Sequence, residues 1–439
     1  MSNHMSNHWH IVNAGVLEEK LYRREIFPGL GLYVLPKPGY QKKYAVFATH
    51  FGSIDNKFQI EGSGEMIAVP DGVAHFLEHK LFEDERGNVF DRFAALGASS
   101  NAYTSFTHTA YLFSCTEYFA ENLELMLDFV QEPYFTAETV RNEQGIIRQE
   151  IRMYEDNPQW RVFFNLLEAL YTEHPVRNDI AGTWESIAQI TPELLYQCYR
   201  TYYHPSNMAL FVVGDIEPDE VGRQVEANIS KRGYSPLGQI KRFYPEEGPA
   251  VSRRRVTQEL VVSEPLFHLG FKDAAVTRFK GRDLLRRELC MELLLDIIFG
   301  ESEALYNDLY RDGLIDDSFD YGYTAESSYA YTLIGGKTRD PEVLLERIMA
   351  GIDQVKRGGI TAEQFERHRR SQLGDFLRRF NSLEFIANNF LAYHFKGIDL
   401  FDYPQLLQEV KQEDVEALLD ENLDPESPVV SLIIPKKEG

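Results

Sequence analysis

Residues 191–214 read TPELLYQCYRTYYHPSNMALFVVG, a pattern that predicts a capped amphipathic helix, a proline turn and an apolar strand. Residues 411–434, KQEDVEALLDENLDPESPVVSLII, repeat this order 220 positions further on. A second echo joins residues 136–138 to residues 361–363: both read Thr-Ala-Glu, and both open a long helical pattern, 225 positions apart. Because two separate echoes fall at nearly the same offset, the sequence predicts a duplicated domain.

The duplication sets the expected domain boundaries. Residues 230–255 are rich in Gly, Pro and basic residues and lack periodicity, which is typical of a linker. We therefore expect an N-terminal domain over residues 1–229 and a homologous C-terminal domain over residues 256–439. Strand and helix patterns do not alternate regularly in either half, so the sequence predicts two homologous α+β domains and not a doubly wound fold.

The chain is strongly acidic. Its 439 residues include 68 Asp and Glu against 45 Lys and Arg, which gives a formal net charge of −23. Such a charge repels nucleic acid and anionic membrane surfaces, so we expect neither as a partner. No segment approaches the ~18 consecutive apolar residues of a membrane span. With only three scattered cysteines and no basic cap before an apolar run at the N-terminus, the sequence predicts a cytoplasmic protein.

Residues 73–82, VAHFLEHKLF, carry a pattern that could hold a metal. His75 and His79 are four positions apart, so on a helix both imidazoles project from one face and can converge on one ion. Imidazole is a good zinc ligand, and Glu78 lies at the edge of the same face, as in the inverted zincin motif H-x-x-E-H. The alternative is a pair of buried structural histidines, because this motif arises by chance in about one chain in twenty.

A catalytic zinc needs a third protein ligand. Glu143 and Glu150 are seven positions apart in a helical pattern, so they share one face of the helix. Two acids with this spacing are more often part of a solvated surface. The presence of the His75/His79 pair favours the metal interpretation, and the sequence pattern alone leaves both open.

The zinc motif is the centre of a longer series of matches that extends over about residues 25–225. The segments are His75-Phe76-Leu77-Glu78-His79 with Phe82, Leu96-Gly97-Ala98, Asn101-Ala102-Tyr103-Thr104, the Glu143/Glu150 helix, His174-Pro175, Gly182-Thr183 and His204-Pro205-Ser206-Asn207. In the order and spacing of these segments, the sequence resembles the N-terminal domain of the pitrilysin/insulinase family of zinc peptidases, which includes the mitochondrial processing peptidase.

The resemblance implies a role for individual residues of the first half. His75, His79 and Glu150 would bind one Zn²⁺ per chain. Glu78 would be the general base that takes a proton from a zinc-activated water, and Glu143 would orient a ligand. The first domain, residues 1–229, would thus be the zinc-bearing domain.

The resemblance also implies the substrate and its binding mode. Asn101, Ala102 and Tyr103 match the edge strand on which family members lay a peptide as an added strand. The expected activity is that of a zinc metalloendopeptidase, a hydrolase that cuts small or unfolded peptides. The alternatives are a non-catalytic core or scaffold subunit of a related peptidase assembly, and a chaperone that binds peptides without cutting them.

The second half lacks the zinc motif. At an offset of 220, His75 and His79 map onto Leu295 and Phe299, so this half cannot repeat the site. In the family, the second domain forms the opposite wall of a clam-shaped chamber, and we expect the duplicated domains here to form one half of such a chamber.

The second half also departs from the pattern of self-sufficient family members. These carry an Arg and a Tyr in a segment like L-R-E-x-G-L-x-Y, and at the matching positions this chain has Tyr310 and Asp316. Shifting the alignment by one residue would place Arg311 at the position of the Arg. The departure resembles bacterial paired-subunit members, in which one chain holds zinc and its partner supplies the Arg/Tyr pair. We therefore expect a heterodimer with a related zinc-less subunit, with a homodimer as the alternative.

Overall fold

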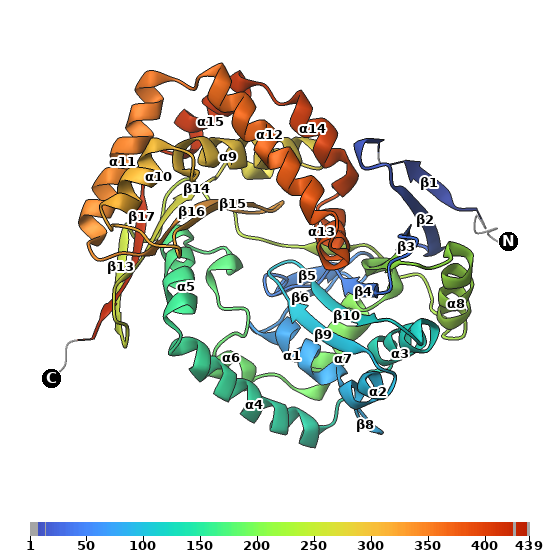
Figure 1. Ribbon diagram of the computed structural model, residues 1–439. Helices are drawn as coiled ribbons and strands as arrows, with labels where there is room; N and C mark the ends of the chain where they lie inside the picture. The colour runs from blue at the N-terminus through green and yellow to red at the C-terminus, as the bar shows by residue number, and fades with distance from the viewer. Residues whose placement is uncertain (1–7, 14, 425–426, 437–439) are drawn as a thin grey trace. The chain divides into compact units, whose positions relative to one another are not determined.

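The computed structural model describes residues 8–13, 15–424 and 427–436 and contains two compact units (Figure 1). Unit 1 consists of Met1–Ile151, Asp179–Phe243 and Arg379–Phe395. Unit 2 consists of Arg152–Asn178, Tyr244–Arg378 and Lys396–Gly439. Each unit thus contains segments from both halves of the chain. None of the described helices is both long and apolar enough to cross a membrane.

Unit 1 is built on a seven-stranded sheet, in which β11 runs parallel to β3 and all other neighbours are antiparallel. Every residue of β11 is buried, so this strand forms the centre of the core. A three-stranded sheet and a short hairpin lie beside it. In spatial order the strands are β1 (His10–Asn13), β2 (Lys20–Phe27), β3 (Leu30–Pro36), β11 (Met208–Gly214), β4 (Lys43–Thr49), β10 (Thr109–Cys115) and β9 (Ser99–Thr104); then β12 (Ile240–Arg242), β5 (Lys57–Ile60) and β6 (Met66–Ala68); and β7 (Glu83–Asp84) with β8 (Gly87–Asn88).

The helices of unit 1 include one from the second half of the chain, α13. Helix α4 is continuous across the unit boundary after Ile151. The helices are α1 (Val73–Leu81), α2 (Val89–Ala95), α3 (Phe119–Gln131), α4 (Ala137–Glu155), α6 (Trp184–Ile187), α7 (Pro192–Tyr202), α8 (Pro218–Ser230) and α13 (Leu383–Phe395), with 3-10 turns η1 (Gly15–Leu17) and η3 (Pro205–Asn207).

Unit 2 is built on a five-stranded sheet. In spatial order its strands are β13 (Arg255–Leu260), β17 (Val429–Pro435), β14 (Leu266–Lys272), β16 (Ala330–Lys337) and β15 (Asp320–Ala325). Its helices are α5 (Pro158–Leu170), α9 (Arg282–Phe299), α10 (Ala304–Arg311), α11 (Pro341–Gly358), α12 (Ala362–Arg379), α14 (Tyr403–Glu409) and α15 (Gln412–Asn422), with 3-10 turns η2 (Pro175–Arg177), η4 (Val276–Arg278) and η5 (Leu400–Asp402).

The two sheets share one topology. Strands β3-β11-β4-β10-β9 of unit 1 and strands β13-β17-β14-β16-β15 of unit 2 have the same spatial order and the same chain order. In each sheet only the first pair is parallel, β11 with β3 and β17 with β13. The echoed segments open α4 and α12, at Ala137 and Ala362. The predicted duplicated α+β architecture is therefore confirmed.

The two halves exchange one helix each. Helix α5 belongs to the first half of the chain but packs on β14 and β17, where Val162 joins Leu266 and Ile433 in one apolar cluster. Helix α13 belongs to the second half but packs on β4 and β11, where Phe390 contacts Phe211 with ring centroids 4.7 Å apart. The sequence-based boundaries, 1–229, 230–255 and 256–439, describe the order of the chain and stay a prediction.

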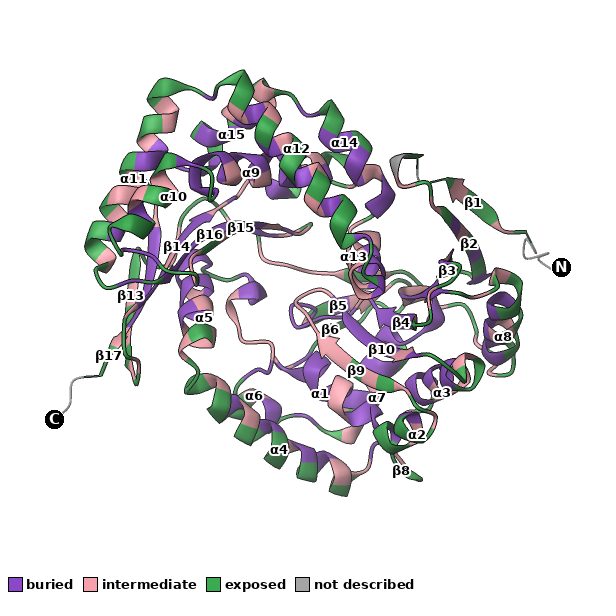
Figure 2. Cartoon of the chain, viewed as in Figure 1, coloured by how far each residue is buried: buried purple, intermediate pink, exposed green. Residues whose placement is uncertain are grey.

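The first strand of the β9–β10 hairpin is the edge of the unit 1 sheet. None of the six residues of β9 is buried, whereas five of the seven residues of β10 are (Figure 2). Within the described part of the chain, β9 pairs only with β10. One side of β9 therefore presents main-chain groups that no other strand uses.

Candidate metal centre and active site

Helix α1 begins at a position that requires glycine. Gly72 caps the helix with a φ of 87°, and a Cβ atom there would lie 2.5 Å from the carbonyl oxygen of Ala181. The apolar residues of α1, among them Phe76 and Leu77, are fully buried. They anchor the helix against β9 and β10, and this fixes the face that carries the two histidines.

The structure brings His75, His79 and Glu150 together. One ligand atom from each lies within 4.8 Å of the others, and no other group of three such residues occurs in the described part of the chain. Glu150 Oε1 lies 3.7 Å from His75 Nε2, and Glu150 Oε2 lies 3.5 Å from His79 Nε2. These distances are long for hydrogen bonds. They are close to the separation of about 3.4 Å expected between two ligands that each lie about 2.1 Å from one tetrahedral ion.

Glu143 orients one of the two rings. Its Oε1 lies 2.9 Å from His79 Nδ1, and because an ionised carboxylate only accepts, Nδ1 carries the proton. The lone pair of His79 is therefore on Nε2, the atom that faces Glu150. Burial lowers the pKa of His79, but the hydrogen bond and the charges of Glu143 and Glu150 outweigh it and leave the pKa raised.

His75 lies in a more apolar environment. Burial and the neighbouring His79 lower the pKa of His75 to about 3, so the ring is neutral, as a metal ligand must be. Its Nδ1 is buried and has no hydrogen-bond partner among the described residues, and its Nε2 faces Glu150 at 3.7 Å, which is too long for a hydrogen bond. The donor set of two imidazoles and one carboxylate fits a bound cation such as zinc.

Glu78 lies beside this group. The Thr104 hydroxyl donates to Glu78 Oε2 at 2.7 Å, and this contact fixes the direction of the carboxylate. Burial raises the pKa of Glu78. A carboxylate with a raised pKa is better matched to proton transfer near neutral pH than a solvated one. Sequence patterns predict no role for Thr104, and its position directly after Asn101-Ala102-Tyr103 is the signal that could have indicated one.

A cavity of about 550 Å³ opens next to the group. Glu78, His79 and Glu143 line one part of it, together with Asn101 and Ala102 of β9. Two of the three predicted substrate-binding residues therefore lie beside the predicted base.

The third predicted substrate-binding residue, Tyr103, is placed differently. It does not line the cavity, and its hydroxyl lies 3.4 Å from His108 Nε2. In the second half, Leu295 and Phe299 are core residues of α9, each 1% exposed. Arg311 is exposed at the end of α10, where it pairs with Asp308 at 2.9 Å.

Comparison with protein families identifies the class. The model described as "Insulinase (Peptidase family M16)" matches residues 62–184, and the model described as "Peptidase M16 inactive domain" matches residues 189–372. The first match contains the H-x-x-E-H helix and Glu150. The chain belongs to the M16 family of peptidases, the insulinase/pitrilysin family.

Individual relatives agree with this assignment. The chain is 48% identical over 422 residues to YmfH of Bacillus subtilis, described as an uncharacterized zinc protease; the match covers 96% of this chain and 98% of YmfH. Among solved structures, an M16-like peptidase from Alicyclobacillus acidocaldarius is 40% identical with a TM-score of 0.91, covering 95% of this chain and 99% of that one. Pitrilysin, at 14% identity and a TM-score of 0.75, shares the fold over 98% of this chain and 47% of its own.

Proposed function

We propose that this chain is a zinc-dependent endopeptidase that hydrolyses small or unfolded peptides. The observation that carries the proposal is the convergence of His75, His79 and Glu150 at ligand-to-ligand distances, with Glu78 beside them. These three residues would hold the zinc ion. When bound there, zinc supplies a Lewis acid that polarises a carbonyl group and makes water more acidic.

The surrounding residues supply proton transfer and orientation. Glu78 accepts the proton of the attacking water and returns it to the leaving amine, and the Thr104 hydroxyl keeps the carboxylate in one direction. Glu143 keeps the proton of His79 on Nδ1. Glu78 and Glu143 thus have different tasks because one contacts a hydroxyl and the other an imidazole.

The peptide would bind as an additional strand on β9. Main-chain hydrogen bonds of this kind give affinity with little demand on sequence, which suits a peptidase for unfolded chains. The exposed edge of β9 and the lining of the cavity by Asn101 and Ala102 support this binding mode, with Tyr103 at the end of the same edge.

We further propose that the working enzyme is a heterodimer with a related zinc-less chain. Tyr310 and Asp316 stand where self-sufficient relatives would carry Arg and Tyr, and Arg311 is exposed and paired with Asp308. A partner that supplies the missing pair would complete the site. A scaffold subunit would have no chemical need for the four residues His75, Glu78, His79 and Glu150, so the peptidase interpretation is preferred.

One experiment separates these functions. The chain is purified from its native host with any associated subunit, its zinc content is measured by elemental analysis, and cleavage of quenched peptides is followed with and without a chelator. We expect one zinc per chain and cleavage that the chelator abolishes. Glu78→Gln should keep the zinc and lose cleavage, and the exposed Glu65→Gln is the matched control. A zinc-loaded complex that binds peptides without cutting them would refute the proposal.

A further inference from the structure

The turn of the β9–β10 hairpin lies next to the proposed base. Thr104, the last residue of β9, donates to Glu78 Oε2 at 2.7 Å, and its hydroxyl also lies 3.3 Å from that of Thr109, its neighbour in β10. Residues 105–108 connect these two threonines and form the turn. The direction of the Glu78 carboxylate therefore depends on how this turn is held.

The main chain of the turn is bound by the loop that follows β4. The Ser53 N–H donates to the Ser105 carbonyl oxygen at 3.1 Å, and the Ile54 N–H donates to that of Phe106 at 3.1 Å. The approach is so close that a Cβ atom on Gly52 would lie 2.3 Å from the carbonyl carbon of Phe106. These bonds hold the first two residues of the turn, and its last residue is held through its side chain.

That last residue, His108, bridges the two neighbours of Thr104. Its Nδ1 lies 3.0 Å from Ser105 Oγ, and its Nε2 lies 3.4 Å from the Tyr103 hydroxyl. The Tyr103 and His108 rings also meet edge to face, with centroids 5.6 Å apart. His108 is only 7% exposed. Because Tyr103 and Ser105 flank Thr104 in the chain, the imidazole restricts the position of Thr104 from both sides.

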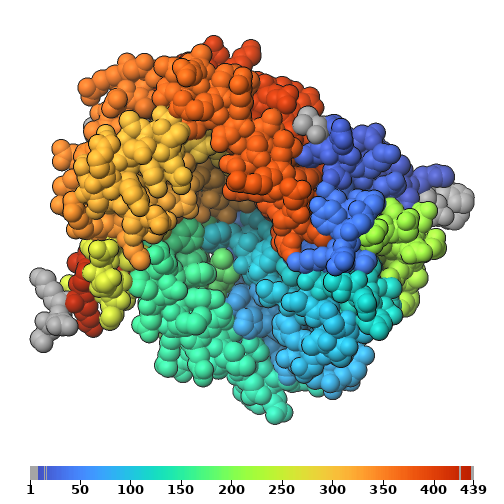
Figure 3. Space-filling model, viewed as in Figure 1, coloured from blue at the N-terminus to red at the C-terminus, as the bar shows by residue number. Residues whose placement is uncertain are grey.

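The His108 ring is supported by α13, a helix from the second half of the chain. Phe395, the last residue of α13, lies against His108 with ring centroids 5.9 Å apart, and it stacks on His50 at 4.9 Å with planes 18° from parallel. In the space-filling view, orange-red residues of the segment that includes α13 lie against blue residues of the first half (Figure 3). A residue of the second half thus completes the packing around a turn of the first half.

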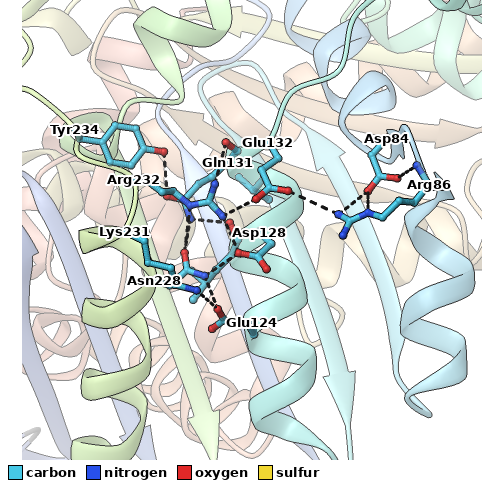
Figure 4. Close-up of polar contacts among 12 residues, drawn as sticks. Asp84, Arg86, Glu124, Asp128, Gln131, Glu132, Asn228, Lys231, Arg232 and Tyr234 are labelled. Carbon is cyan, nitrogen blue, oxygen red and sulfur yellow. Dashed lines mark hydrogen bonds and ion pairs between the residues drawn. The ribbon is translucent and has the colours of Figure 1, made fainter.

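The β7–β8 hairpin, which directly follows α1, is held in a different way. Its Arg86 donates to Asp84 and lies 3.7 Å from Glu132 of α3 (Figure 4). The side chains of Arg86 and Glu132 are 62% and 48% exposed, so water and salt screen this ion pair. The β9–β10 turn relies on packed rings and short polar contacts, which fix a neighbouring catalytic group more firmly.

Given the hydrolytic function proposed above, we propose that His108 is a positioning residue of the peptidase and that Phe395 supports it. His108 holds the two residues that flank Thr104, and the Thr104 hydroxyl keeps the Glu78 carboxylate directed at the attacking water. Neither His108 nor Phe395 transfers a proton. A small displacement of a catalytic group lowers the rate of the chemical step, so loss of either ring should reduce kcat and leave zinc binding unchanged.

A double-mutant cycle tests whether His108 acts through Thr104. In the native complex, His108→Ala and Thr104→Val should each lower kcat for a quenched peptide about tenfold, with zinc content unchanged and KM little affected. The double variant should match Thr104→Val within about twofold, because the two side chains act on one carboxylate. His108→Asn, whose amide nitrogen can replace Nδ1 toward Ser105, should recover most of the rate. Independent losses that multiply to about a hundredfold, or an unchanged kcat in His108→Ala, would overturn the proposal.

Hydrogen exchange tests the support from α13 without the need for turnover. Phe395→Leu should speed amide exchange in residues 99–109 and lower kcat about threefold. Phe385→Leu, the same substitution near the start of α13, is the matched control and should leave both unchanged, and urea unfolding establishes that both variants fold. Unchanged exchange in Phe395→Leu would overturn the role of α13. Absence of cleavage by the parent complex would count against the proposed function, and exchange at Thr104 in His108→Ala would still show whether His108 holds this residue.

Discussion

The hydrogen bond between Glu143 and His79 predicts a defined loss of metal affinity in Glu143→Gln. Glutamine has the same shape, and its amide oxygen can still accept from His79 Nδ1, so the fold and the ring orientation should persist. What the substitution removes is the negative charge next to the ring. Because the side chains of His79 and Glu143 are only 26% and 11% exposed, respectively, solvent screens this charge only weakly.

The size of the effect follows from two independent estimates. A hydrogen bond to a charged group contributes about 1.5–3 kcal/mol. Loss of a carboxylate that supports a metal-bound histidine lowers metal affinity about 10–100-fold, or about 1.4–2.8 kcal/mol at about 1.4 kcal/mol per factor of ten. The donor–acceptor distance of 2.9 Å is typical of a full-strength bond. We therefore expect the zinc Kd to rise about 10–100-fold.

The assay is a competition for zinc between the protein and a chromophoric chelator at fixed pH. Glu138→Gln is the matched control, because it makes the same change on an exposed face in the first turn of the same helix. His79→Ala sets the scale for loss of a ligand. A Kd for Glu143→Gln within twofold of the parent protein would refute the role of Glu143, because the charge would then make no difference to the ring.

Three further predictions test other parts of the molecule. Glu78→Gln should lower peptide hydrolysis at least about 1000-fold with zinc content unchanged; substantial turnover would exclude Glu78 as the base. Gly72→Ala should destabilise the fold by about 2 kcal/mol in urea unfolding, because the position has a φ of 87° and the added Cβ would lie against the backbone of Ala181. Gly145→Ala should stabilise the fold by about 0.5–1 kcal/mol, because its Cβ would lie in open space within α4. Burial raises the pKa of Glu292 to about 8 from 4.5, so between these pH values the folded chain holds a proton that the unfolded chain has released. The free energy of unfolding should therefore fall as the pH rises from about 4.5 to 8, by up to about 1.4 kcal/mol per pH unit. In urea unfolding, Glu292→Gln should flatten this slope.

Local patterns in the sequence were sufficient to predict that the domain is duplicated. The segment at residues 191–214 forms α7, η3 and β11, and Thr191 caps α7 through its hydroxyl as the pattern predicts. The exchange of α5 and α13 could not be predicted in this way. Periodicity shows that a helix has an apolar face, but it does not show which of two similar sheets that face will meet.

In the candidate site, too, local features could be predicted from the sequence, and features that depend on packing could not. A spacing of four residues on one helix places His75 and His79 on the same face, so their proximity is a local property. The pairing of Glu150 with these rings depends on how α4 packs against the rest of unit 1, and a spacing of seven fits a solvated surface equally well. The environment of Lys80 could not be predicted from the sequence. A lysine in an amphipathic helix is expected to lie in solvent, but Lys80 is fully buried and forms an ion pair with Glu83.

The comparison of the two sheets gives a physical reason to regard the site as functional. Both units build the same five-stranded topology, but α9 carries the core residues Leu295 and Phe299 where the sequence offset places the two histidines. The fold therefore does not need polar groups at these positions. In unit 1 the burial of His75 lowers its pKa to about 3, and each buried polar group without a partner costs about 1–3 kcal/mol. An apolar pair would avoid this cost, and this supports the proposed role of His75, His79 and Glu150 as ligands of a cation.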